Sequence, residues 1–320
     1  MANARLGGHF SYLERNFYLP MYVTRFAPTP SGPLHFGSLI TLLGAFLRSR
    51  ALKGKLLIRI EDLDTPRCPQ GMAELILDEI KSLGLSFDDE VLYQSKNLRR
   101  YEERLKELND KGLVFKCSCS RDDLRQRPCQ CLKCNDILKK QNISLRLNSK
   151  ALKEPNASSK RAFTDELLGE LSLPKLTNFN DEYLTLKRRD GIFSYNFACV
   201  VDDIDTGVTE IVRGADLIEV TPEQLSLYKA FNQKAPHYLH LPLALENSER
   251  KLSKQNHAKN VLEVLSPQDA LREALIFLDQ DVSYIKGTLD CKDILNNAIA
   301  HFNLNAISKA PKLAPKCTCE

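Results

Sequence analysis

The first segment that could carry chemistry spans residues 25–38, RFAPTPSGPLHFGS. It places His35 and Gly37 where an apolar strand over residues 21–27 gives way to a helix that we expect to open near Gly37. Free backbone N–H groups and the helix dipole attract phosphate at such a junction, and a glycine lets the backbone approach a nucleotide closely. The segment therefore indicates a phosphate-binding site.

The second segment lies far along the chain, at residues 251–255, and reads KLSKQ. Its two ammonium groups, Lys251 and Lys254, can neutralise the charge that builds on a phosphate during displacement. Taken alone, a lysine-rich loop is typical of a solvated surface, and a proline- and glycine-containing turn is typical of a simple boundary between elements. Together the two segments predict a site that forms an adenylate.

In order and spacing, the two segments resemble the HIGH and KMSKS signatures of class I aminoacyl-tRNA synthetases, in the glutamyl and glutaminyl form. Four further stretches resemble that subfamily: residues 57–67 (LIRIEDLDTPR), 93–95 (YQS), 191–198 (GIFSYNFA) and 200–216 (VVDDIDTGVTEIVRGAD). The resemblance covers residues 21–256, and six ordered matches make coincidence improbable. It implies a Rossmann-like catalytic domain that uses ATP with Mg²⁺.

The pattern of elements agrees with an α/β fold. Strands over 21–27 and 55–60 flank a helix over 37–53, and a helix over 71–84 is stopped by glycine, as in a parallel sheet with covered faces. The chain lacks the G-x-G-x-x-G and Walker A loops, which argues against a dehydrogenase or a P-loop NTPase. Residues 221–224 (TPEQ) predict the start of a further helix, with Thr221 as its N-cap and Gln224 closing a capping box.

We divide the chain of 320 residues into five parts: an N-terminal extension (1–20), the first half of the catalytic domain (21–116), an insertion (117–185), the second half with the KLSKQ loop (186–256) and a short C-terminal region (257–320). With 43% apolar residues the chain can bury a large core. A net charge of +4 permits binding of tRNA without requiring it. No apolar run approaches the ~20 residues of a membrane helix, and residues 1–20 lack the pattern of a signal peptide, so we expect a cytoplasmic protein. We also expect a monomer.

Five of the ten cysteines fall within residues 117–134. Close cysteine pairs separated by a short loop can surround a tetrahedral Zn²⁺, whereas the alternative is a set of reduced surface thiols. Disulfides are rare in a reducing compartment, so paired cysteines do not explain the cluster. Five exposed free thiols would be prone to oxidation, and we therefore favour zinc. The pair Cys317 and Cys319 near the C-terminus is unexplained, and a ligand role for it is not expected.

The length of the C-terminal region indicates which family within this class the chain resembles most. Only 64 residues run from His257 to the end, whereas a further anticodon-reading domain would need ~100–150 residues. With the sequence KLSKQ, this resembles the glutamyl-queuosine tRNA(Asp) synthetases. That family activates L-glutamate with ATP and transfers it to the cyclopentenediol of queuosine at the wobble position of tRNA(Asp). Two alternatives remain: a truncated glutamyl-tRNA synthetase that charges a tRNA 3′ end, and a synthetase-like binding protein without catalysis.

The same resemblance implies a structural zinc site. In that family a Cys-x-Cys pair, a Tyr and a final Cys hold the metal, and Cys117, Cys119 and Cys134 match three of these positions. The Tyr is missing, and Cys131 or Cys129 would replace it. The expected ligands are Cys117, Cys119, Cys131 and Cys134, with Cys129 as the alternative to Cys131.

Site residues follow from chemistry and from the resemblance. Glu61 ends a predicted strand and could hold the α-ammonium of an amino acid, although a solvated acid is the alternative. Arg213 follows an apolar run, and its planar fork suits a carboxylate, which predicts glutamate over glutamine. Tyr195 could bind the amino acid or be an ordinary packed strand tyrosine. We expect Arg59 and Arg67 to form ion pairs with Asp62 and Asp64.

The resemblance adds the remaining assignments. It implies glutamate-binding residues Arg25, Phe26, Ala27, Pro28, Thr29, Glu61, Tyr195 and Arg213. It implies ATP-binding residues His35, Gly37, Ser38 and Lys254, and catalytic residues His35, Lys251 and Lys254.

Overall fold

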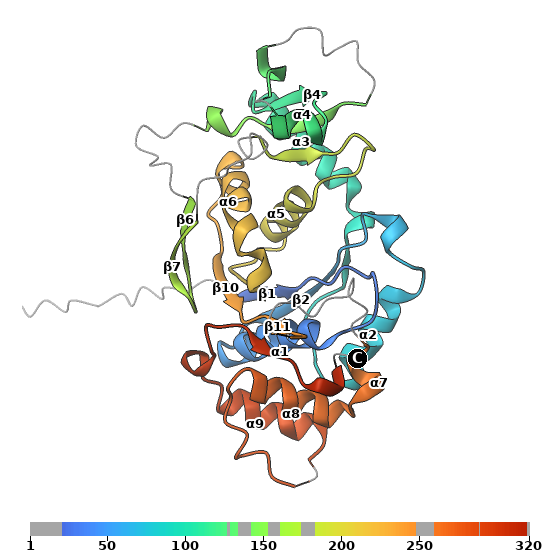
Figure 1. Cartoon of the computed structure of the whole chain (residues 1–320), viewed down its shortest axis with the longest axis vertical. Coiled ribbons are helices and arrows are strands. Elements are labelled where there is room, and N and C mark those ends of the chain that lie inside the picture. The colour runs from blue at the N-terminus through green and yellow to red at the C-terminus, as the bar shows by residue number, and fades with distance from the viewer. Residues whose placement is uncertain are drawn as a thin grey trace, which may run out of the picture.

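The computed structural model describes residues 21–126, 129–133, 142–152, 161–173, 183–247, 259–287 and 289–318. A central α/β body lies between two smaller parts, as Figure 1 shows: the cysteine-bearing insertion at one end and the C-terminal helices at the other. The described residues contain no helix long and apolar enough to span a membrane.

The first half of the body contains three parallel strands and their helices. Residues Val23 to Phe26 of β1 pair in parallel with Lys55 to Ile58 of β2, which in turn pairs with β3. The predicted strands and helices are confirmed, with ends that shift by one or two residues. The elements are β1 (Val23–Phe26), α1 (Phe36–Ala51), β2 (Lys55–Ile60), η1 (Thr65–Arg67), α2 (Met72–Ser82), β3 (Leu92–Tyr93), η2 (Gln94–Lys96) and α3 (Leu98–Asp110).

The second half continues the same sheet. Strand β9 pairs in parallel with β10, and the Thr209 N–H donates to the Val23 carbonyl at 2.9 Å, which places β9 beside β1. The strand order is therefore β3-β2-β1-β9-β10, the Rossmann order, with its reversal between β1 and β9. The elements are α5 (Tyr195–Asp205), β9 (Glu210–Gly214), η6 (Ala215–Val220), α6 (Thr221–Ala230), β10 (His237–Leu241) and β11 (Ala244–Leu245).

Helix α1 is the buried helix of the body. Its apolar side chains, among them Leu39, Leu43 and Leu47, are fully buried in the main core. A Cβ atom at Gly44 would lie 2.5 Å from Leu241 Cδ1, so a larger residue here would force the Leu241 side chain of β10 to move. The close packing fixes where the first turn of α1 points.

The start of α6 differs from the prediction. Val220 already has helical dihedral angles and continues from η6, so Thr221 is the first residue of the helix and no side chain caps it. The buried Thr221 hydroxyl donates to the Leu217 carbonyl and accepts from Arg213, and Gln224 also accepts from Arg213. The predicted capping box is wrong because the preceding helical turn leaves no free end to cap, and these side chains bind the arginine instead.

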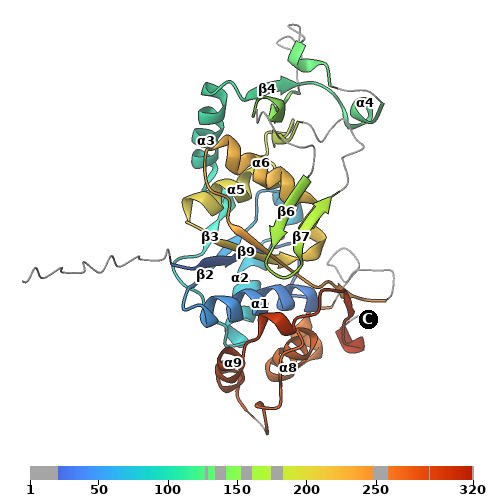
Figure 2. The ribbon, with the colours of Figure 1, turned by 90° about the vertical axis from the view of Figure 1, so that its left-hand side faces the viewer.

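The insertion contains two different substructures. Strands β4, β5 and β8 form a small antiparallel sheet, whereas the β6–β7 hairpin joins the body, since β6 pairs with β10 (Figure 2). The hairpin thus belongs to the core sheet, although its sequence lies within the predicted insertion. The elements are β4 (Val114–Cys117), α4 (Arg121–Gln126), η3 (Cys131–Lys133), β5 (Ser144–Leu147), η5 (Ser149–Ala151), β6 (Arg161–Asp165), β7 (Gly169–Leu173) and β8 (Thr185–Lys187).

The C-terminal region packs against α1, and its last strand pairs with β11 of the second half of the body. Phe277 of α8 meets Phe36 of α1 edge to face, with ring centroids 5.6 Å apart. Strand β12 pairs in parallel with β11, and the Lys312 N–H donates to the Leu243 carbonyl at 3.0 Å. The elements are α7 (Val261–Val264), α8 (Pro267–Phe277), α9 (Cys291–Ala300), η8 (Leu304–Ala306), β12 (Lys312–Leu313) and η9 (Lys316–Thr318).

Candidate active site

A cavity of about 610 Å³ lies where the strand order reverses, outside the carboxyl ends of β1, β9 and β10. Open α/β sheets bind their ligands at this point. Ten of the predicted site residues line the cavity: Arg25, Phe26, Ala27, Pro28, Thr29, His35, Gly37, Ser38, Tyr195 and Arg213. The structure thus brings together residues that are spread over 189 positions of the sequence, 213 minus 25 plus one.

The cavity lining does not include every predicted site residue. Glu61 is not part of the cavity lining, and Lys251 and Lys254 fall outside the described residues. The lining also contains residues that sequence reasoning did not single out: Ser31, Thr41, Val212, Gly214, Asp216, Leu217, Pro242, Leu243 and Ala244. Arg67, which was expected to form a structural ion pair, lines the cavity as well, and Asp64 pairs with Arg188. Asp216 and Gly214 fall within a stretch that resembles the family, whereas Pro242 to Ala244 carry no chemical signal of their own.

The first turn of α1 forms one wall of the cavity. His35 is the N-cap residue, and its Nδ1 accepts a hydrogen bond of 3.2 Å from the Ser38 backbone N–H. A Cβ atom at Gly37 would lie 3.0 Å from His35 Cε1, so the glycine leaves room for the imidazole. The positive end of the α1 dipole therefore faces the cavity next to a histidine, an arrangement suited to phosphate.

Arg213, at the end of β9, is held by neutral acceptors only. Its Nε donates to His240 Nε2 at 3.0 Å, Nη1 donates to Gln224 Oε1 at 2.7 Å, and Nη2 donates to Thr221 Oγ1 and the Leu217 carbonyl. The side chain is 3% exposed, and within the described part of the chain it forms no ion pair. The guanidinium thus lines the cavity with no carboxylate of the described residues in ion-pair contact, which suits a ligand carboxylate.

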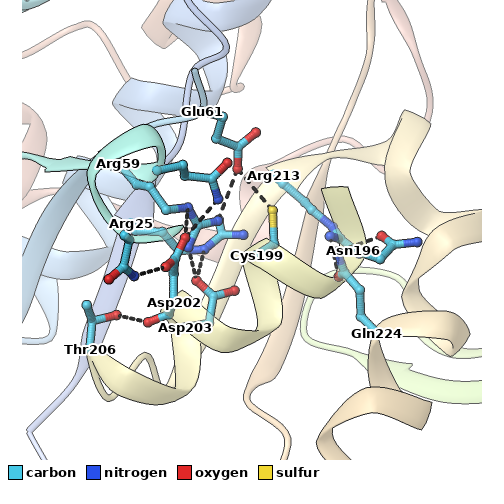
Figure 3. Close-up of polar contacts among 12 residues, drawn as sticks. Arg25, Arg59, Glu61, Asn196, Cys199, Asp202, Asp203, Thr206, Arg213 and Gln224 are labelled. Atoms are coloured by element: carbon cyan, nitrogen blue, oxygen red, sulfur yellow. Dashed lines mark hydrogen bonds and ion pairs between the residues drawn. The ribbon is translucent and has the colours of Figure 1, made fainter. Parts of the chain in front are cut away.

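Arg25, at the end of β1, lies in a different environment (Figure 3). Its Nε donates to Asp203 Oδ1 at 3.1 Å, and Arg59 Nη1 donates to the same oxygen. Arg59 Nη2 also donates to Glu61 Oε1 at 3.1 Å. Burial alone would raise the pKa of Asp203, but the two guanidinium groups outweigh it and hold that pKa below its usual range. This buried network joins β1, β2 and α5.

The expected partners of Arg59 were therefore wrong. Arg59 is a structural ion-pair residue as predicted, but it pairs with Asp203 and Glu61 and not with Asp62. Asp62 accepts hydrogen bonds from the Ser95 N–H and hydroxyl instead. The side chain of a strand residue points to the opposite face from that of its immediate neighbours, so Arg59 shares a face with Glu61, two positions on.

Glu61 directly follows β2 outside the cavity lining, whereas Tyr195 begins α5 and lines the cavity. Glu61 is 8% exposed, and its Oε1 also accepts from the Cys199 thiol at 3.1 Å, so it is not a solvated acid. Tyr195 is the first residue of α5, which Ser194 caps, and it is 40% exposed where it lines the cavity. It is therefore not a packed strand tyrosine, and its hydroxyl belongs to a side chain open to ligands.

A second candidate site lies in the insertion. The sulfur atoms of Cys117, Cys119, Cys129 and Cys131 all lie within 4.8 Å of one another, with closest pairs at 3.5 to 3.9 Å. Four thiolates about 2.3 Å from a tetrahedral Zn²⁺ would lie about 3.8 Å apart, so the cluster fits zinc. Burial raises the pKa of Cys119 to about 11. At Cys131 burial also acts to raise the pKa, but hydrogen bonds from the Ser118 backbone and the three neighbouring thiols outweigh it and lower that pKa to about 7.

The cluster includes both cysteines that were expected to be alternatives. Cys129 and Cys131 each contribute a sulfur atom, and Cys134 lies outside the described residues. The described thiols alone supply four ligands. Arg189 anchors this region to the body, since its Nη2 donates to the Ser118 carbonyl at 2.7 Å.

Comparisons with known proteins agree with this geometry. Residues 21–281 match the family model described as tRNA synthetases class I (E and Q), catalytic domain. A glutamate tRNA ligase from Elizabethkingia meningosepticum, solved in complex with its amino acid, superposes with a TM-score of 0.72 at 22% identity, over 93% of this chain and 68% of that one. At this identity the likeness shows the shared fold.

Curated relatives are more similar in sequence. The glutamyl-Q tRNA(Asp) synthetase of Cronobacter sakazakii is 44% identical over 301 residues, which cover 92% of this chain and 96% of that protein. The protein of the same name from Photorhabdus laumondii is 41% identical, over 91% of this chain and 90% of its own. The expected resemblance is confirmed: the chain belongs to the glutamyl-Q tRNA(Asp) synthetase family of class I synthetases.

Proposed function

We propose that this protein activates L-glutamate with ATP and transfers the glutamyl group to the queuosine of tRNA(Asp). The single observation that carries the choice of amino acid is Arg213, a buried cavity-lining guanidinium bound only to neutral acceptors in the described part of the chain. A glutamate side-chain carboxylate supplies the missing negative charge, whereas a glutamine amide leaves it unmatched. The names of the relatives supply the tRNA.

Glutamate would lie between β1, β9 and α5. Arg213 would bind its side-chain carboxylate, with Arg25 and the backbone of residues 26–29 along the opposite wall. The Tyr195 hydroxyl would hydrogen-bond the amino acid. Glu61, which follows β2 outside the cavity lining and has one oxygen atom held by Arg59, would attract its α-ammonium group.

ATP would lie over the start of α1. His35, with the backbone of Gly37 and Ser38, would hold phosphate oxygens at the positive end of the helix. Lys254, aided by Lys251, would stabilise the charge that develops on the α-phosphate. Mg²⁺ bound with ATP supplies further neutralisation of the phosphate charge.

The first step needs no protein nucleophile. A glutamate α-carboxylate oxygen attacks the α-phosphorus, the new O–P bond forms as the bond to the β-phosphate oxygen breaks, and pyrophosphate leaves. In the second step a hydroxyl of the queuosine diol attacks the glutamyl carbonyl, the ester forms, and AMP leaves while the hydroxyl proton passes to solvent. The protein positions the reactants and stabilises charge.

The test is incorporation of radiolabelled glutamate, with ATP, into matched tRNA(Asp) preparations with and without queuosine. We expect labelling only of the queuosine-containing tRNA. Labelling of tRNA(Glu) irrespective of queuosine would instead identify a glutamyl-tRNA synthetase that charges 3′ ends. No labelling together with no ATP–pyrophosphate exchange would identify a binding protein.

Lys254→Ala tests the lysine loop. Loss of one preorganised donor to a developing charge costs about 3–4 kcal/mol, so exchange should fall at least about a hundredfold. Lys309→Ala is the matched control, since it removes the charge of an exposed lysine without an assigned role. Exchange by Lys254→Ala within a few-fold of the parent would contradict the role of the lysine.

We also propose that the four clustered cysteines bind one structural Zn²⁺. All four ligand positions would be sulfur, which leaves no open position for chemistry, and none of these cysteines lines the cavity. Elemental analysis should find about one zinc per chain, lost in Cys117→Ser but retained in Cys291→Ser, whose thiol lies on α9. Because the cluster is remote from the cavity, Cys117→Ser should keep pyrophosphate exchange within about twofold if it folds. Full metal content in Cys117→Ser would exclude this site.

We retain the expectation of a monomer. We retain the expectation of a cytoplasmic location, where ATP and tRNA are available. Both belong to the proposal.

A further inference from the structure

Three buried side chains from three different strands form a line that ends at the cavity. Asp165 ends β6, His240 lies on β10, and Arg213 lies near the end of β9. We propose that Asp165 and His240 are positioning residues for glutamate recognition: they orient Arg213 while leaving its charge available to the substrate carboxylate. This inference rests on the proposed function and deepens it.

The Asp165 carboxylate is fixed as an acceptor. Its Oδ1 accepts from the backbone N–H groups of Leu167 and Leu168 at 3.0 and 2.9 Å, in the turn between β6 and β7. Its Oδ2 accepts from the His240 backbone N–H at 3.0 Å and lies 2.7 Å from His240 Nδ1. Because the carboxylate has only lone pairs to offer, Nδ1 must carry the proton and donate it.

The other ring nitrogen is then fixed as well. Arg213 Nε lies 3.0 Å from His240 Nε2 and can only donate, so Nε2 must be unprotonated. A protonated imidazole would set two N–H groups against each other at this distance. Burial and the charge of Arg213 hold the pKa of His240 below its usual range, although its hydrogen bond with Asp165 opposes this. Geometry and electrostatics thus select one neutral tautomer.

The neutral imidazole orients Arg213 without neutralising its positive charge. A carboxylate placed directly against Arg213 would orient the guanidinium but would also neutralise it and compete with the substrate. The imidazole places Asp165 one side chain away, so the acid sets the direction of the hydrogen bonds while an uncharged nitrogen touches Arg213. Glutamate over glutamine is therefore selected partly by residues that do not line the cavity.

The experiment compares His240→Leu with His240→Gln in ATP–pyrophosphate exchange, with glutamate and glutamine as alternative substrates. Loss of a hydrogen bond to a charged group should raise the KM for glutamate at least about tenfold in His240→Leu. The KM for ATP should stay unchanged, and the preference for glutamate over glutamine should fall by a similar factor. His240→Gln should recover most of both, because its amide oxygen can accept from Arg213.

Tyr238→Phe is the matched control. Tyr238 lies on the same strand with its ring stacked on His240, centroids 6.0 Å apart, and its buried hydroxyl has no hydrogen-bond partner among the described residues. This variant should keep the parent values. If His240 were only structural, His240→Leu would lower the fraction of active protein but leave the KM for glutamate and the preference for glutamate over glutamine unchanged. That result would overturn the inference.

Nitrogen-15 NMR of histidine-labelled parent protein gives a readout that does not depend on activity. We expect a neutral His240 with a protonated Nδ1 and an unprotonated Nε2 at pH 7. An imidazolium signal or the opposite tautomer would overturn the inference even if exchange is normal. A correct tautomer in a parent that shows no exchange with glutamate would instead overturn the proposed function.

Discussion

Two buried arginines, Arg25 and Arg213, line the same cavity but have different partners. Arg25 lies beside Asp203, so its charge is balanced within the protein. Arg213 donates to a histidine, an amide, a hydroxyl and a carbonyl, all of them neutral acceptors in the described part of the chain. The two side chains are almost equally buried, at 4% and 3% exposure.

The difference separates a structural charge from a recognition charge. A buried arginine with its own acid has lost most of its attraction for a further anion, whereas one held by neutral acceptors keeps it and depends on its surroundings for orientation. The Arg25 network also holds Arg59 and, through it, Glu61, so it ties three elements together. Substitutions in the two networks should therefore have different effects.

The largest effect on stability should come from Asp203→Asn. This change leaves Arg25 and Arg59 without their shared counter-charge, and breaking a buried pair in this way costs about 3–5 kcal/mol. Chemical denaturation of the purified variant measures the loss. The comparison between the two arginines would fail if the variant were as stable as the parent.

Asp205→Asn is the control for that measurement, two positions along α5. Asp205 pairs with Arg100 and Arg104 nearer the surface, with 23% of its side chain exposed. Pairs of this kind contribute at most about 1 kcal/mol. A loss as large as that of Asp203→Asn would show that burial does not distinguish the two acids.

Arg213→Met should act mainly on substrate recognition. Removing the guanidinium that faces the glutamate carboxylate should lower kcat/KM for glutamate by about 10²–10³ in pyrophosphate exchange, equivalent to about 3–4 kcal/mol. Stability should fall by no more than about 2 kcal/mol, since its protein partners are uncharged. A normal kcat/KM together with a large loss of stability would reverse the assignment of the two arginines.

Tyr195→Phe should have the smallest effect. The change removes one hydroxyl from a side chain that is 40% exposed at the cavity, which corresponds to about 1 kcal/mol of neutral hydrogen bonding. The KM for glutamate should rise about three- to tenfold with little change in stability. Tyr284→Phe, on an exposed tyrosine of the C-terminal region, should leave the KM unchanged. Equal KM values for Tyr195→Phe and the parent would remove Tyr195 from the binding site.

Local patterns predicted much of the fold. The strand Lys55–Ile60 has the expected bounds, and α1 begins one residue before Gly37, because alternating and helical apolar patterns act over neighbouring residues. The cavity residues from Arg25 to Ser38 were predictable for the same reason, since one strand–turn–helix unit positions them all.

Contacts between distant segments could not be predicted in this way. His240 meets Asp165 across 75 positions, and no periodicity in either segment indicates that pairing. Thr221 has the sequence of a helix cap, yet the arginine beside it determines its hydrogen bonds. Arg59 was correctly expected to form an ion pair, but its partner on α5 depends on how α5 packs on the sheet.

The pairing of β11 with β12 also bears on when the enzyme becomes complete during translation. Ala244 lies opposite Lys312, so the strand that leads from the cavity toward the lysine loop gains its neighbour only after residue 313 has been synthesised. Domains generally fold as units, and the core that buries α1 includes Ala314. A nascent chain arrested before that point would lack both this core residue and the neighbour of β11, so glutamate binding and turnover should appear together, once the C-terminal segment has left the ribosome.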